Sequence, residues 1–213
     1  MILYLHGFAS GPGSSKARGM AERFARLGVP LSIPDLTPGE QGFERSTPSS
    51  MLAIAEAALA SAPPPHAVMG SSLGGYLAAL AASRSAGIER LVLLAPAFRL
   101  AERWLGRLSA EELRLWKERG LEVDHFASGR RRRIGYAFME DASRWPPFPE
   151  VRVPALCITG KRDEVVPPAD VEAWVGRTPS ARLLMVDDDH QLLASLDRIF
   201  EEARAFLAPV TGR

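Results

Sequence analysis

Cysteine is nearly absent from this chain, and histidine is scarce. Cys157 is the only cysteine among 213 residues, so no internal disulfide can form. Its apolar neighbours predict a buried strand, in which cysteine acts as a small apolar residue. A zinc site needs several cysteines or paired histidines, and the chain has neither pattern. The three aspartates at 187–189 lack the spaced oxygen ligands and the glycine of a calcium loop. We therefore expect no bound metal.

Long apolar runs and targeting segments are also missing. Residues 1–5 are apolar, but His6-Gly7 ends the run, whereas a secretory signal needs a basic start and a longer apolar stretch. No run approaches the roughly 18 apolar residues of a membrane span. The glycines that follow residues 2–5 do not form the G-x-G-x-x-G pattern of a dinucleotide site. We expect a cytoplasmic protein with no membrane segment and no cofactor.

Charge gives little indication of a partner, because the net charge is +1 and the isoelectric point is about 8.0. One run, Arg130-Arg131-Arg132-Arg133, would suit an anionic substrate or a nucleic acid. Such a run more often forms a solvated loop or helix face. The near-neutral chain and the nearby acidic residues at 140–141 argue against nucleic acid, so we expect no nucleic-acid partner.

Short apolar runs alternate with amphipathic ones along most of the chain, which indicates a parallel sheet with crossover helices. The apolar runs are continuous, as expected for strands buried on both faces. The length and a hydrophobic content of 46% fit one domain over residues 1–213. We predict an α/β fold with a mostly parallel sheet of about six strands. The predicted strands are residues 2–5, 31–33, 67–69, 91–94, 155–159 and 183–186, the predicted helices are 15–27, 47–61, 73–85 and 191–207, and residues 34–47 are a predicted loop.

Residues 99–150 break this rhythm, since they show no clear strand and two or three helical stretches. We predict that this insert forms a helical cap over the carboxyl ends of the strands. Trp104, Trp116 and Phe138 are candidates for the wall of a substrate pocket. The alternative is that the rings form a small core of the insert. Its aromatic residues are Trp104, Trp116, Phe126, Tyr136, Phe138, Trp145 and Phe148.

Residues 70–74 read Gly-Ser-Ser-Leu-Gly and carry the strongest chemical signal. They follow an apolar run and open an Ala/Leu-rich stretch, which is the strand–turn–helix context that G-x-S-x-G requires. The turn would hold Ser72 in a strained conformation, with its hydroxyl exposed at the positive end of the following helix. The alternative is that small residues here only allow close packing. We predict that Ser72 is a nucleophile.

A serine nucleophile needs a base, and the chain has four histidines. His190 lies after the last predicted strand, so it should emerge on the same rim of the sheet as Ser72. We predict that His190 is the base, the alternative being an exposed histidine at a helix start. His6 is expected to be a structural residue of its loop. His66 lies just before a predicted strand and His125 lies in the insert, so neither is favoured as the base.

The base needs a carboxylate to orient it. Asp163 follows the strand 155–159 and should emerge on the same rim. The chain order is then Ser72, Asp163, His190, which is the order of nucleophile-elbow hydrolases. We predict Asp163 as the acid, with Glu164 and the aspartates at 187–189 as competitors.

An acyl-transfer site also needs two donors for the oxyanion of its tetrahedral intermediate. The backbone N–H of Leu73, next to the nucleophile, would supply one. The loop after the first strand would supply the other, and we predict the N–H of Phe8, with Gly7 allowing the backbone to come close.

The motifs together resemble the α/β-hydrolase superfamily. They are Tyr-Leu-His-Gly-Phe at 4–8, Gly-Ser-Ser-Leu-Gly-Gly at 70–75, Gly-Lys-Arg-Asp at 160–163 and Asp-His at 189–190. The small bacterial esterase branch, whose chains also begin at the H-G-F strand, is the most similar. Two departures from the larger hydrolases are that their first two strands are missing here and that the insert matches no cap of known substrate.

The resemblance implies an enzyme that cleaves a small-molecule ester or thioester with Ser72, Asp163 and His190 as its triad. Together with the aromatic insert, it predicts a serine hydrolase for esters of small to medium apolar acyl groups. The alternatives are a thioesterase, an amidase or peptidase with the same triad, a lyase or cofactor-free haloperoxidase on the same fold, or a protein that only binds a ligand.

Overall fold

A sheet of six parallel strands forms the centre of the protein in the computed structural model, which describes residues 1–39 and 41–212. The strand order is β2-β1-β3-β4-β7-β8, and each neighbouring pair is parallel. The predicted α/β class and the six predicted strands are confirmed. The strands are β1 Ile2–Leu5, β2 Leu31–Ser32, β3 His66–Ser71, β4 Ile88–Leu94, β7 Ala155–Gly160 and β8 Ala181–Val186.

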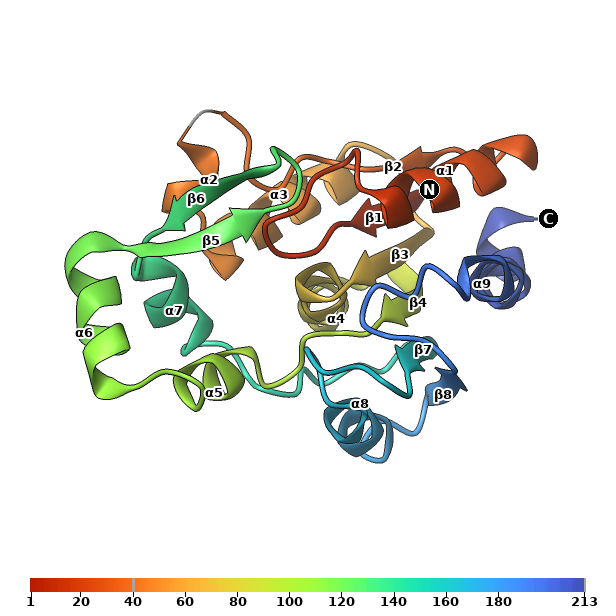
Figure 1. Cartoon of the computed structure of the whole chain (residues 1–213). Coiled ribbons are helices and arrows are strands. Elements are labelled where there is room, and N and C mark those ends of the chain that lie inside the picture. Colours follow the sequence, from red (N-terminus) through yellow and green to blue (C-terminus); the bar gives the residue numbers. More distant parts are fainter. Residues whose placement is uncertain (40, 213) are drawn as a thin grey trace.

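Helices cover both faces of this sheet (Figure 1). Successive strand side chains point to opposite faces, so Leu3 and Leu5 belong to one apolar cluster while Ile2 and Tyr4 belong to the other. The cluster with Leu3 packs under α3, α4 and α8, and the cluster with Ile2 packs under α1 and α9. These helices are α1 Ser15–Arg26, α3 Pro48–Ala60, α4 Leu73–Arg84, α8 Pro168–Val175 and α9 Leu196–Thr211.

Three of these helices follow their predicted bounds closely, but the last does not. The predicted helix 191–207 begins only at Leu196. Two aspartates of the preceding loop explain this, because Asp189 accepts a hydrogen bond from the Gln191 amide and Asp188 accepts one from the Ser195 amide. These bonds hold the loop in turns ahead of the helix. No helix in the described part of the chain is both long and apolar enough to cross a membrane.

Two short helices were not predicted. The predicted loop 34–47 contains α2 (Gly42–Arg45), whose Phe43 is fully buried; Glu40 of that loop lies outside the described residues. The helix α8 follows the loop after β7 and begins with Pro168 at its first turn. Both are too short for a clear apolar period in the sequence.

The three helices within residues 99–150 agree with the predicted two or three helical stretches, but the prediction that this insert has no clear strand is wrong. The insert contains an antiparallel hairpin in which Glu122 lies opposite Arg133 and Asp124 lies opposite Arg131. Oppositely charged pairs across a hairpin stabilise it. Because its strands are rich in charged residues, the sequence has no apolar run here that would predict them. The four arginines are therefore part of a strand, not of a loop or helix face. The elements of the insert are α5 Leu100–Leu105, α6 Ala110–Arg119, β5 Leu121–His125, β6 Arg130–Ile134 and α7 Ala137–Ala142.

The insert lies at the end of the sheet toward which the strands run, away from both termini (Figure 1). The Ala127 amide at the tip of the hairpin donates to the carbonyl of Ala9, in the loop after β1. Arg103 of α5 donates to the carbonyl of Val165, in the loop after β7. The insert is thus fastened to the loops at the carboxyl ends of the strands, as a cap would be.

Candidate active site

Ser72 stands at the turn between β3 and α4, and its backbone is strained. Its φ is 53° and its ψ is −117°, a conformation that residues other than glycine rarely adopt. The Ser72 amide donates to the carbonyl of Leu94 over 2.8 Å, and the Ser72 carbonyl accepts from the Ala97 amide over 3.0 Å. Both partners lie at or just after the end of β4, so the neighbouring strand holds the strained turn in place.

The glycines of the motif let the turn fit between strand and helix. A Cβ atom at Gly74 would overlap the carbonyl oxygen of Leu5, and one at Gly70 would overlap that of Gly74. Gly7 also lies beside the nucleophile, since a Cβ there would be 3.5 Å from the Ser72 Cβ. The loop after β1 and the serine turn are therefore direct neighbours.

Asp163 and His190 meet on the rim formed by the ends of β7 and β8. The Nδ1 atom of His190 lies 2.7 Å from Oδ2 of Asp163. The other carboxylate oxygen accepts the amides of Val165 and Val166 over 2.9 and 2.8 Å. The Asp163 side chain is fully buried and the His190 side chain is 14% exposed. A carboxylate fixed in this way orients the imidazole and leaves its Nε2 for proton transfer.

The three competing aspartates are engaged elsewhere, and the carboxylate of Glu164 is not hydrogen-bonded to His190. Asp187 forms an exposed ion pair with Arg162. Asp188 accepts backbone hydrogen bonds from Asp189 and Ser195; although burial opposes the effect, these bonds lower the pKa of Asp188. Asp189 accepts from the Gln191 amide. The hydrogen bond to His190 therefore distinguishes Asp163.

His6 has a structural environment at the start of the loop after β1. It is buried, its Nδ1 lies 3.1 Å from the carbonyl oxygen of Gly7, and its Nε2 accepts the amide of Leu36 over 3.1 Å. Burial lowers the pKa of His6, which favours the neutral ring that these two bonds require. His6 thus ties the loop after β1 to the segment after β2.

The two predicted oxyanion donors belong to the serine turn and to the neighbouring loop after β1. Leu73 is the first residue of α4, where an amide has no partner within its own helix. Phe8 follows Gly7, whose backbone lies beside Ser72. Among the described residues, neither amide donates a hydrogen bond, so both are available to a substrate oxygen.

Rings of the insert pack directly on Phe8. The Phe8 ring lies 5.1 Å from that of Trp104 and 5.3 Å from that of Phe138, measured between centroids. Phe138 is fully buried, and Trp116 is buried with its Nε1 donating to the carbonyl of Ile134. Trp104 is half-buried. Of the three candidate pocket residues, Trp104 alone keeps appreciable exposed surface next to Phe8, whereas the other two are buried.

Lys16 was not among the predicted site residues, yet its side chain lies beneath the rim. Lys16 is only 8% exposed, and its Nζ donates to Ser71 Oγ over 2.9 Å and to the His190 carbonyl over 3.4 Å. A signal was present, because Lys16, Met20 and Phe24 follow one another at four-residue spacing and share the buried face of α1. A lysine on the buried face of a helix needs a polar or charged partner within the protein.

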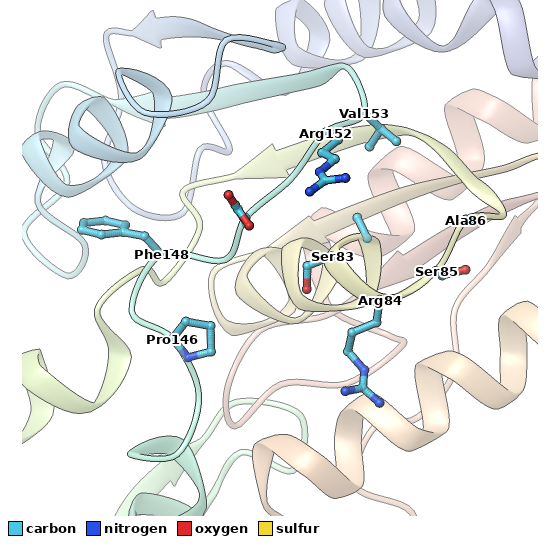
Figure 2. Close-up of a pocket in the computed structure, with 10 residues that line it drawn as sticks. Ser83, Arg84, Ser85, Ala86, Pro146, Phe148, Arg152 and Val153 are labelled. Atoms are coloured by element: carbon cyan, nitrogen blue, oxygen red, sulfur yellow. The ribbon is translucent and has the colours of Figure 1, made fainter.

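A separate hollow of about 830 Å³ lies far from the serine. Figure 2 shows it between the C-terminal turn of α4 and the segment that leads into β7, with Arg84 and Arg152 among its lining residues. Ser72 precedes the other end of α4, and a helix of 12 residues is about 18 Å long. This hollow is therefore distinct from the rim. Among the described residues, no group of three or more His, Cys, Asp or Glu side chains is placed to hold a metal ion.

Known proteins with similar sequences include esterases. The chain is 27% identical over 247 aligned residues to the pimeloyl-[acyl-carrier protein] methyl ester esterase of Xanthomonas oryzae pv. oryzae (strain MAFF 311018), and the alignment covers 98% of this chain and 95% of the relative.

Solved structures of similar fold cover almost the whole chain. Mouse alpha/beta hydrolase domain-containing protein 10 matches with a TM-score of 0.81 and 22% identity, over 98% of this chain and 89% of the mouse chain. Est1E from Butyrivibrio proteoclasticus, with ferulic acid bound, matches with a TM-score of 0.79 and 21% identity, over 100% of this chain and 89% of Est1E. The fold is thus that of the α/β hydrolases, as the resemblance implied. A family model matches residues 1–208, and the chain therefore belongs to the uncharacterised protein family UPF0227.

Proposed function

We propose that this protein is a serine hydrolase that cleaves carboxylic esters of small to medium apolar acyl groups through an acyl-Ser72 intermediate. The observation that carries the proposal is the 2.7 Å hydrogen bond between His190 and a buried Asp163, on the same rim as the strained Ser72 turn. A buried carboxylate, an oriented imidazole and a partly exposed serine at a strained turn are the parts that acyl transfer requires.

The class of reaction agrees with the relatives. The chain is a carboxylesterase-like hydrolase, because its curated relatives are named esterases and its structural neighbours include hydrolases and lipolytic enzymes. One set of relatives is named for a methyl ester. Methyl esters of acyl chains therefore belong among the substrates to test.

In the proposed mechanism, His190 accepts the proton of the Ser72 hydroxyl while Oγ attacks the ester carbonyl carbon. The amides of Phe8 and Leu73 stabilise the oxyanion of the tetrahedral intermediate. His190 then donates its proton to the leaving alcohol, and the acyl-enzyme remains. A water molecule, deprotonated by His190, attacks this acyl group and releases the acid and free Ser72. Asp163 holds the imidazole and stabilises its cation throughout.

The acyl group would lie against the apolar surface formed by Phe8 and Trp104. The backbone of Phe8 faces the reacting carbonyl in this mechanism, and its ring contacts the half-buried Trp104. Phe138 and Trp116 support this surface from behind, since both are buried. An apolar wall beside the oxyanion donors favours apolar acyl groups.

The test combines a covalent label with a substrate series. A fluorophosphonate probe should label the wild-type protein stoichiometrically, and Ser72→Ala should take no label. Turnover should be measured on p-nitrophenyl esters of graded acyl length, methyl esters, acyl-CoAs and aminoacyl anilides, with ester turnover expected to dominate. A folded wild-type protein that takes no label would overturn the serine mechanism. Preference for acyl-CoAs or anilides would overturn the proposed ester class while keeping the triad.

A further inference from the structure

Lys16 is a buried cation that the mechanism above does not use. It lies on the first turn of α1, on the face that packs against the sheet. Its ammonium reaches two different parts of the rim, Ser71 Oγ at 2.9 Å and the backbone carbonyl of His190 at 3.4 Å. Ser71 directly precedes the nucleophile, so a single side chain joins the serine turn to the loop that carries the base.

The groups around the ammonium come from several elements. Asp163 faces it from the loop after β7, and Asp188 and Asp189 face it from the loop after β8, with His190 beside them. The Tyr4 hydroxyl of β1 approaches the same Ser71 from the sheet.

Farther along α1, the next cation on the side facing α9 is Arg23, which pairs with Asp197 of that helix and not with the rim. Lys16, by contrast, lies close enough to the three rim carboxylates to interact with their charges. Burial lowers the pKa of Lys16 to about 8, although the three carboxylates partly offset this effect.

We propose that Lys16 is a positioning residue whose ammonium holds the Ser72 turn and the His190 loop in register. The proposal rests on the proposed function, since it assigns Lys16 a task only if Ser72 and His190 react together. An ammonium can donate three charge-assisted hydrogen bonds, so it can hold both acceptors at once. A neutral amine holds them more weakly. A small loss of register between nucleophile and base can reduce the rate about 10²-fold.

A structural role alone would have a different signature. If Lys16 only docked α1 on the sheet, its replacement would change stability and leave the chemistry of the folded enzyme unchanged. If Lys16 aligns the site, kcat should fall while KM stays nearly constant, and kcat should depend on the charge of Lys16. Activity should then decrease as the pH rises through about 8, because the ammonium loses its proton there.

The main experiment compares Lys16→Met with wild type, using pH-stat titration of ester hydrolysis. Methionine keeps an unbranched, flexible side chain that is one heavy atom shorter, and it removes the charge and the donors. We expect a 10- to 100-fold lower kcat, a KM within about twofold, and loss of the alkaline decrease that wild type shows near pH 8. The matched control is Arg23→Met, which removes a cation two turns along the same helix. It should leave kcat and its pH profile unchanged.

A second variant keeps the proposal testable should Lys16→Met fail to fold. Ser71→Ala removes the nearer acceptor and leaves the lysine, so we expect a smaller loss of kcat, about three- to tenfold, at unchanged KM. Folded Lys16→Met with wild-type kcat and pH profile would overturn the proposal. A wild-type profile that stays flat up to about pH 9, or a Ser71→Ala enzyme with full kcat, would also overturn it.

The fluorophosphonate label separates this failure from failure of the proposed function. If wild type takes the label and hydrolyses esters while Lys16→Met does so equally fast, only the role of Lys16 is wrong. If wild type takes no label, the serine mechanism itself is wrong.

Discussion

The rim of the sheet and the insert above it differ in how their residues affect stability. The rim places a non-glycine residue at positive φ and buries a carboxylate and an ammonium close together. The insert contains aromatic rings that pack edge-on or tilted against one another and against Phe8, and its charged side chains pair across an exposed hairpin. Strain and buried charge lower stability, whereas packed rings raise it. The contrast agrees with the proposal that the rim carries the chemistry, while the insert stabilises the structure around it.

The sharpest test of this contrast replaces the nucleophile or the base. Ser72→Ala and His190→Ala should each lower kcat by roughly 10⁴- to 10⁶-fold, because each removes a group that acts only as part of the triad. Stability should hardly fall, and Ser72→Ala should retain its Tm, since a strained serine contributes little packing. Kinetics on a p-nitrophenyl ester and thermal unfolding measure both. Near-normal turnover in either variant would contradict the assigned roles.

The acid of the triad offers a matched pair of substitutions on the same rim. Asp163→Asn should lower kcat by roughly 10⁴-fold, because the amide places the imidazole in the wrong tautomer. Asp187→Asn removes a carboxylate of the next loop that pairs with Arg162 in solvent, so kcat should stay within about twofold. Steady-state kinetics on one ester compares the two. An equal effect of both substitutions would refute the assignment of Asp163.

In the insert, the large effects should be on stability. Trp116→Ala should lower the free energy of unfolding by about 3–5 kcal/mol, because it empties a fully buried site and leaves the Ile134 carbonyl without its donor. Phe126→Ala is the control from the same insert, since Phe126 is 74% exposed and should change stability by less than about 0.5 kcal/mol. Urea unfolding measures both. Equal values for the two variants would mean that Trp116 has no core role.

The same contrast explains which parts of the structure could be predicted from the sequence. The serine turn and the sheet were predictable because their signals are local: glycines where the backbone permits no side chain, and apolar runs where strands are buried on both faces. The hairpin was not predictable in this way. Its first strand, Leu121–His125, alternates apolar and charged residues over only five positions, and its second, Arg130–Ile134, begins with four arginines. Only the register of their cross-strand pairs makes them a hairpin.

Lys16 shows a second limit of prediction from sequence. Its position on the apolar stripe of α1 is visible in the sequence, but its partners lie 55 and 174 residues away. A buried charge can be recognised only when the groups that compensate it are known. Likewise, the start of α9 depends on which backbone amides donate hydrogen bonds to the loop aspartates. Helix propensity carries no information about these bonds.

The smallest predicted effect is on stability, because burying the Lys16 ammonium lowers the free energy of unfolding. Lys16 has a pKa of about 8 in the folded protein against 10.5 when unperturbed, so between these values the unfolded chain binds a proton that the folded one does not. Stability contributed by this residue should therefore rise with pH, by up to about 3 kcal/mol. Burial raises the pKa of Tyr4 and Cys157, which opposes the rise, but both groups are also present in Lys16→Met. The difference in unfolding free energy, wild type minus Lys16→Met, should thus increase from pH 8 to 10 in urea titrations. Since kcat is expected to fall over the same range, the stability contributed by Lys16 should rise while activity falls, and a difference that stays constant with pH would show that burial does not lower the pKa of Lys16.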